Sequence, residues 1–364
     1  GWGELDLDIK QEAITLNGMT YADPDLPLFL GAFSEQSPVK MEIHEMLPSG
    51  ISYFQHMGIS HKEVFREQVL SYLEALGLRA ELNAEVERIE KAYGFNPVND
   101  LVQILDDEMA WFAIDGVTGG PDEEFLIIET ASRSETVDVV MNWVRQYLRV
   151  HAFDMQSLRS VYRLDQQTSF NIYHLPDQFF KGTALGSLFN KYFMVFDNYL
   201  IFGHSVDGLS RVIYQNVLHK TFISDPVFQE ISDYLSNRSN LTLFFRPYAY
   251  MQYKRDMMNK KASDYLEKAE LFFRRIPGLV IQFSNEDDLI YQSISCHYTH
   301  QIRDKARTVW ESLMDTAVMI KPVLVVNHNT SEKEIFVQDL ANKIYLINGT
   351  GRILWKQALD GPIM

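Results

Sequence analysis

Apolar residues recur along the chain with two spacings, one typical of β-strands and one typical of α-helices. The first half of the chain shows both clearly. Residues 5–21 alternate apolar and polar on either side of a polar break, which is typical of a β-hairpin. Residues 60–77 repeat apolar positions at helical spacing, so we predict a helix with Ser60 as N-cap, Glu63 completing a capping box and Gly77 at its end. The remaining predicted elements of this half are a helix over 34–48, a strand over 50–57, a helix over 82–95 and a hairpin over 108–131.

The second half repeats this order of elements. The predicted elements are a hairpin over 191–205, helices over 206–218 and 224–235, a strand over 240–247, a long helix over 250–276 and a hairpin over 279–298. Residues 50–57 then correspond to 240–247, and 108–131 to 278–299. We therefore predict an α+β fold made of an internally duplicated ββαβαββ module. Its first repeat covers 1–160 and its second 161–300; chance recurrence in two α+β segments is the alternative.

The end of the chain has a different pattern. After a predicted linker helix over 301–320, residues 321–364 contain four short β-prone runs separated by Asn, Gly and Thr turns. Residues 344–347 and 353–356 would be neighbouring strands around the turn that contains Gly349 and Gly351. This segment is similar to one repeat of a quinoprotein-type β-propeller, which predicts an all-β, blade-like segment truncated from a larger ring.

A single blade cannot bury both of its faces, so the resemblance implies that the natural protein continues past the last residue. Tyr345 and Trp355 would then lack their natural neighbours and would pack on the α+β module or on a second copy of the chain. The alternative is a four-stranded tail that packs on the preceding domain.

Composition narrows the classes of partner. The chain has 364 residues, of which 46% are hydrophobic and 13% aromatic, enough for two globular domains. Its net charge of -16 and pI near 5.1 oppose binding to nucleic acid or to an anionic membrane. No apolar stretch is long enough to span a membrane, and the first residue is Gly, so we expect an N-terminal segment, such as an export signal or anchor, to be missing.

One family resemblance covers most of the chain. Its marks are Gly203 with His204 and Ser205, Leu209, the run from Ser224 to Phe228, and the strand from Leu241 to Phe245. With these residues the chain resembles, over about 300 residues, the bacterial family catalogued as domain of unknown function 3352, in its Bacteroidetes type. The resemblance implies an envelope-facing protein on the periplasmic side of the membrane. It transfers no active-site residue.

The sequence does not nominate a catalytic, cofactor-binding or metal-ligating residue. His56 and His61 straddle a predicted strand end and helix start, which directs their rings apart and disfavours a shared metal ion. Cys296 is alone and is predicted to be a buried structural thiol. The acidic cluster of Asp106, Asp107 and Glu108 is predicted to lie at a turn, solvated by water.

Two functions from different classes remain open. The first is a non-catalytic envelope module that binds protein or acts as a scaffold, with a protein partner or self-association through the blade. Phe179 and Phe180 follow a proline in a predicted loop and, with Tyr345 and Trp355, are the predicted partner contacts. The alternative is a hydrolase or carbohydrate-active enzyme whose catalytic carboxylates are dispersed along the chain. No cofactor is predicted for either.

Overall fold

A computed structural model describes residues 2–21, 28–114, 123–164, 168–177, 179–183, 185–186, 188–253, 258–286, 289–299, 312–328, 333–349 and 351–363. The chain divides into two compact units. The larger unit contains residues 1–116 and 121–302, and the smaller one contains 117–120 and 303–364.

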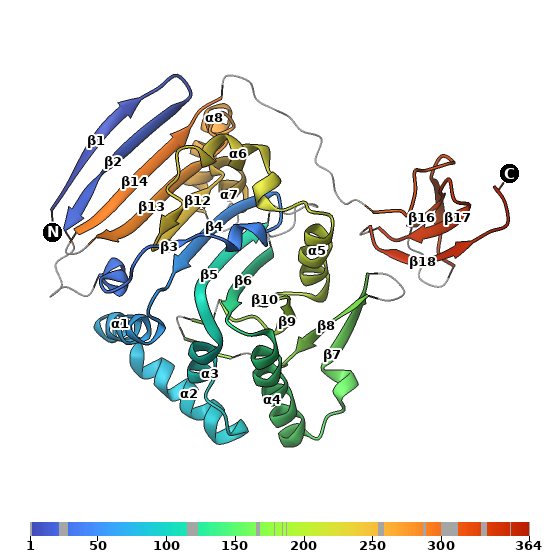
Figure 1. The fold of residues 1–364 in the computed structure, drawn as a ribbon, viewed down its shortest axis with the longest axis horizontal. Coiled ribbons are helices and arrows are strands. Elements are labelled where there is room, and N and C mark those ends of the chain that lie inside the picture. Colours follow the sequence, from blue (N-terminus) through green and yellow to red (C-terminus); the bar gives the residue numbers. More distant parts are fainter. Residues whose placement is uncertain are drawn as a thin grey trace. The chain divides into compact units, whose positions relative to one another are not determined.

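The larger unit is built on one antiparallel sheet of twelve strands (Figure 1). Their order is β1-β2-β14-β13-β12-β4-β5-β6-β10-β9-β8-β7. The bounds are β1 Trp2–Ile9, β2 Ala13–Tyr21, β4 Ile51–Gly58, β5 Leu105–Ile114, β6 Glu123–Thr130, β7 Arg159–Arg163, β8 Ser169–His174, β9 Tyr192–Phe196, β10 Tyr199–Gly203, β12 Leu241–Phe245, β13 Leu279–Glu286 and β14 Leu289–His297. A separate two-stranded sheet joins β3 Val39–Lys40 to β11 Arg238–Ser239.

This single sheet overturns the prediction of an internally duplicated ββαβαββ module. The N-terminal hairpin pairs through β2 with β14, from the second predicted repeat, and β10 of that repeat pairs with β6 of the first. At the centre β4 pairs with β12, so strands of both halves alternate in one hydrogen-bonded surface. The predicted boundary between residues 160 and 161 falls inside β7. Neither half closes a sheet of its own, and the fold is one mostly antiparallel sheet with helices.

Helices cover both faces of the central strands, which are therefore buried on both sides. On one face, α1, α2 and α4 pack with Leu126 and Ile128 of β6. On the other, α5 and α6 pack with Phe112, Phe125 and Ile127. The bounds are α1 Lys62–Ala75, α2 Arg79–Tyr93, α3 Pro97–Ile104, α4 Arg133–His151, α5 Val206–Val217, α6 Pro226–Ser232, α7 Pro247–Tyr253 and α8 Lys260–Phe273, with 3-10 helices η1 Phe29–Phe33, η2 Ile43–Glu45, η3 Met155–Ser157 and η4 Phe222–Ser224.

Three local predictions differ from the structure. Residues 34–48 hold β3 and η2 instead of an α-helix. Helix α1 begins after His61, and Ser60 does not cap it, because the Ser60 hydroxyl accepts a hydrogen bond from Ser37 N at 2.8 Å. The long helix over 250–276 is two helices, α7 and α8, with residues 254–257 outside the described range.

The smaller unit is a four-stranded antiparallel sheet of β15 Val323–Val326, β16 Lys333–Gln338, β17 Lys343–Ile347 and β18 Ile353–Ala358. Its core contains Val337, Tyr345 and Ile347, with Met314 packed against them. The predicted blade-like strands are therefore present as one four-stranded sheet, and the described residues form no closed barrel or propeller. Residues 312–320 contain no helix, and the rest of the predicted linker helix over 301–320 lies in the undescribed range 301–311.

No helix among the described residues is long and apolar enough to cross a membrane.

Candidate ligand pocket

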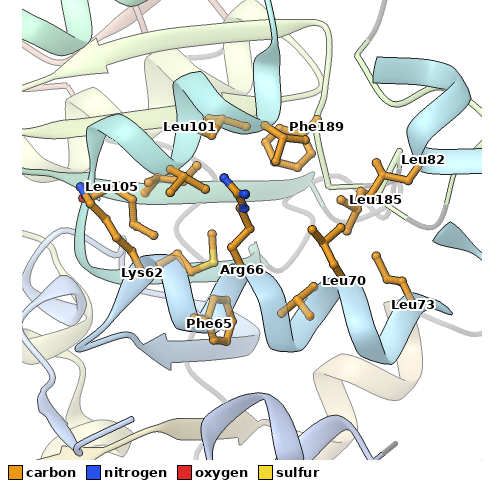
Figure 2. A pocket seen from close by; sticks show the side chains of 15 residues that line it. Lys62, Phe65, Arg66, Leu70, Leu73, Leu82, Leu101, Leu105, Leu185 and Phe189 are labelled. Carbon is orange, nitrogen blue, oxygen red and sulfur yellow. The ribbon is translucent and has the colours of Figure 1, made fainter. Parts of the chain in front are cut away.

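An apolar cavity of about 130 Å³ lies in the larger unit between α1, α2, α3, β5 and β6, with Leu185 and Phe189. Figure 2 shows the side chains that line it. They are Lys62, Phe65, Arg66, Val69, Leu70, Leu73, Leu82, Val98, Leu101, Val102, Leu105, Met109, Ile128, Leu185 and Phe189. Almost all of the lining surface is carbon or sulfur. The cavity can therefore hold an apolar group but offers it almost no hydrogen-bond partner.

Local sequence explains how the two helices frame the cavity. On α1 the apolar side chains recur at residues 65, 69, 70 and 73, which places them on one stripe facing the sheet. Helix α3 is a short segment whose start is fixed by Asn96, because the Asn96 side chain accepts hydrogen bonds from Val98 N and Asn99 N. Pro97 occupies its first position. The apolar residues 98, 101 and 102 then line the cavity.

Two positively charged side chains, those of Lys62 and Arg66, lie beside this apolar lining. Lys62 Nζ donates hydrogen bonds to the carbonyl oxygens of Gln103 at 2.9 Å and Leu105 at 2.8 Å, so it ties α1 to the end of α3. The Arg66 side chain is 31% exposed, and its Nη2 lies 2.9 Å from the carboxylate of Glu67. In Figure 2 Arg66 extends from α1 toward Leu101 and Phe189. The Arg66 guanidinium is thus paired with neighbouring polar side chains, and mainly the carbon atoms of this residue line the cavity.

The size of the cavity carries an energetic implication. Protein interiors are packed nearly as densely as organic crystals, and unfilled volume costs stability. An apolar molecule that fills such a space restores contacts that the lining side chains lack. A comparable engineered apolar cavity binds benzene or xenon. The space therefore suits a small apolar molecule or the end of an aliphatic chain.

A buried polar pair occupies the other face of the sheet. Glu108 on β5 is 1% exposed and His56 on β4 is fully buried, and their Oε1 and Nε2 atoms lie 2.9 Å apart. The Glu108 carboxylate also accepts hydrogen bonds from Glu42 N at 2.9 Å and Ile43 N at 2.8 Å. The prediction that Glu108 is solvated at a turn is wrong. Its carboxylate instead fixes η2, since it holds the backbone N–H groups that a helix would have used.

Glu129 on β6 lies on the same face as Glu108. Burial, and then the nearby charges of Glu108 and Asp106, raise the pKa of the Glu129 carboxyl to about 7. Tyr199 on β10 faces Glu129 in the strand register, and burial followed by the Glu129 charge raises the pKa of its phenol. Glu129 can exchange a proton near neutral pH, but its carboxylate neighbour Glu108 is held by backbone N–H groups.

The predicted contact residues have different surroundings. Phe179 and Phe180 are 6% and 1% exposed and belong to the core beside α4, where the Phe179 ring lies 5.3 Å from that of Trp143. The interpretation of these two residues as exposed anchors is therefore wrong. Tyr345 is fully buried and donates a hydrogen bond to Asp339 Oδ2 at 2.7 Å. Trp355 is 44% exposed, and its role as a partner contact stays a prediction.

The histidines and the cysteine are also placed by the structure. His61 is exposed next to α1, whereas His56 is enclosed with Glu108. Within the described part of the chain, no three His, Cys, Asp or Glu side chains are grouped so that they could hold a metal ion. Cys296 is partly buried on β14, and burial raises the pKa of its thiol. The thiol therefore stays in its less reactive, protonated form at neutral pH.

Comparison of the chain with protein-family models, curated proteins and solved structures finds no match. The resemblances to the envelope family and to the propeller repeat thus stay predictions. Sequence reasoning missed the cavity, because its α1 stripe has the same spacing as the stripe of any helix packed on a core. A signal for the cavity could have been the apolar segment at residues 97–104, which follows Asn96 directly. A helix of this length is too short to cover the whole apolar stripe of α1.

Proposed function

We propose that the larger unit is a non-catalytic binding module that holds a small apolar molecule, or the end of an aliphatic chain, in the cavity between α1 and α3. The observation that carries the proposal is the almost wholly apolar lining of a cavity of about 130 Å³. Small-molecule sites in proteins are usually concave and mostly apolar, with few polar groups. Arg66 is partly exposed and is one of the two charged residues in the lining.

The geometry favours binding over the hydrolase alternative. A glycoside hydrolase needs two carboxyl groups that flank a substrate and leave room for it. Glu108 is enclosed and already accepts hydrogen bonds from two backbone N–H groups, so its oxygens are not open to a substrate. Glu129, with its raised pKa, lies beside this closed carboxylate. The cavity itself contains no carboxylate in its lining.

We place this binding module in the cell envelope, on the periplasmic side, as a scaffold that also carries the smaller unit. Support for the location comes from the marks around Gly203, Ser224 and Leu241 that resemble the envelope family. Support for a protein-binding role of the smaller unit comes from one row of its sheet. In register, Val323, Phe336, Leu346 and Trp355 lie opposite one another across all four strands, and Val323 and Trp355 are 51% and 44% exposed.

Fluorobenzene is a suitable probe of the cavity, followed by ¹⁹F NMR and by the thermal unfolding midpoint. We expect saturable binding and a rise of the midpoint with probe concentration, because a ligand that binds only the folded state stabilises it. In the variant Leu70→Trp the indole fills the cavity from α1, so binding should weaken at least tenfold while the midpoint is kept or raised.

Leu76→Trp is the matched control, since Leu76 terminates the same helix but is 51% exposed and lies outside the cavity. This variant should bind fluorobenzene like the native chain. The proposal fails if the native protein shows no saturable binding, or if Leu70→Trp and Leu76→Trp bind the probe equally well.

A further inference from the structure

We infer that the outer edge of β1 is a docking site for an extended segment of another protein in which apolar residues alternate with Lys or Arg. β1 is at one end of the strand order, so no described strand pairs with its outer side. All eight of its residues are exposed. Its outward backbone N–H and C=O groups can therefore accept one more antiparallel strand.

The two faces of β1 differ in chemistry. Residues Leu5, Leu7 and Ile9 point to one face and are 40%, 58% and 69% exposed. They continue an apolar surface onto β2, where Ile14 pairs with Ile9 and Leu16 pairs with Leu7.

The opposite face of β1 carries the acidic side chains at residues 4, 6 and 8, with the exposed Trp2 at its start. Asp8 lies 3.4 Å from Lys10, and both side chains are more than half exposed. Glu4 and Asp6 have no ion pair within the described residues. An added strand therefore meets apolar side chains on one face and two uncompensated carboxylates on the other.

Apart from its acidic side chains, β1 lacks the usual devices that protect a sheet edge. It pairs with β2 from Trp2 opposite Tyr21 to Ile9 opposite Ile14 without a bulge. It is eight residues long, contains no proline and carries no charge on its apolar face. Edges of this kind accept another strand readily.

A second copy of the chain is a poor occupant of this edge. In a two-fold antiparallel pair of β1 strands the same faces adjoin, so Asp6 would lie opposite Asp6 and Glu4 opposite Asp8. Directly opposed like charges are unfavourable in a sheet. The net charge of -16 adds to this repulsion.

The basic strand β7 at the other end of the sheet does not complete β1 either. Followed through the strand registers, Arg159 and Arg163 point to the same sheet face as Leu5 and Leu7. Head-to-tail continuation of the sheet would put these arginines against leucines and leave the carboxylates opposite Ser160 and Tyr162. The complement of β1 is thus a strand with apolar and basic residues in strict alternation, from a different protein.

The test uses the full chain and the peptide acetyl-(Lys-Val)₄-amide, with binding measured by fluorescence anisotropy and the site located by hydrogen–deuterium exchange. We expect protection of residues 2–9 on binding. Asp6→Lys should weaken binding about tenfold, because it converts a favourable cross-strand charge pair into a repulsive one. Asp138→Lys makes the same change of net charge at an exposed position of α4 and should leave binding unchanged.

Two further probes separate strand addition from simple charge attraction. A version of the peptide with alternate backbone nitrogens methylated keeps its charge but cannot complete the hydrogen-bond ladder, and it should not protect β1. Equal binding of the methylated peptide, or binding without protection of residues 2–9, would overturn the inference. So would a concentration-dependent dimer of the native chain that protects β1, because the occupant would then be a second copy.

Discussion

The surroundings of the Glu129 side chain determine its pKa. Its carboxyl is half-buried on β6, and burial, then the charges of Glu108 and Asp106, raise its pKa to about 7 from an ordinary value of 4.5. Between these two pH values the folded chain holds a proton that the unfolded chain has already released. Stability should therefore fall as pH rises through this window and stay lower above it.

Glu129→Gln should remove this pH dependence. We expect the variant to gain stability relative to the native chain at pH 8 and to gain much less at pH 5, because glutamine has no proton to lose. Urea unfolding at the two pH values measures the difference. Glu81→Gln, at an exposed position in the first turn of α2, is the control and should show the same small change at both. Equal effects of Glu129→Gln at pH 5 and pH 8 would contradict the raised pKa.

Glu108 should matter to stability at every pH where its carboxylate is charged. In Glu108→Gln one oxygen becomes an amide donor that points at the N–H groups of Glu42 and Ile43, which leaves buried donors without an acceptor. We expect a loss of about 1–3 kcal/mol in the free energy of unfolding, measured in urea. Asp106→Asn changes an exposed neighbour on the same strand and should cost less than about 0.5 kcal/mol. Similar losses in both variants would refute the role assigned to Glu108.

At the scale of single elements, local signals predicted most of the helices and hairpins. The first hairpin, α1, α2, α5, α6 and the β9–β10 hairpin all lie where periodicity placed them, because their spacing and turn residues are contiguous in sequence. The predicted helix over 34–48 failed because the Glu108 carboxylate, more than 60 residues away, binds two of its backbone N–H groups. Helix α4 was missed, although Ser132 caps it through Glu135 N.

Gly58 lies where β4 closely approaches the small sheet of β3 and β11. A Cβ at this position of β4 would lie 2.6 Å from the Ser239 carbonyl oxygen and 2.9 Å from Val39 Cβ. Backbone cannot move aside as a side-chain tip can, so Gly58→Ala should cost about 1–3 kcal/mol in thermal or urea unfolding. Gly31→Ala is the control, since a Cβ at Gly31 meets nothing within 4 Å. If the two variants are equally stable, the backbone contact at Gly58 does not exclude a Cβ atom and the prediction is wrong.

At the scale of the whole molecule, the sequence could not reveal which strands pair. The central contact joins β4 to β12, where Gln55 lies opposite Leu243, and nothing local in either strand encodes a partner so far along the chain. The cavity could not be predicted from the sequence for the same reason. Its lining comes from α1, α2, α3, two strands, Leu185 and Phe189, so it exists only after those segments meet.

Because the chain divides into two units, a substitution in the smaller unit should destabilise that unit alone. The Tyr345 hydroxyl donates to Asp339 Oδ2 at 2.7 Å and accepts from Asp315 N at 3.1 Å, so both of its partners belong to the smaller unit. Tyr345→Phe leaves the fully buried Asp339 carboxylate without one of its donors. We expect a loss of about 1–3 kcal/mol that is confined to the smaller unit.

Hydrogen–deuterium exchange can distinguish the two units within one chain. In Tyr345→Phe the amides of β16 and β17 should exchange faster, whereas those of β4, β5 and β6 should keep their native rates. The exposed variant Trp355→Phe serves as the control, because its ring lies on the opposite face of β18 from Lys356, the residue that pairs with Tyr345. Faster exchange in the central strands of the large sheet would mean that the two units unfold together, and the loss of one phenolic hydroxyl would then weaken the entire chain.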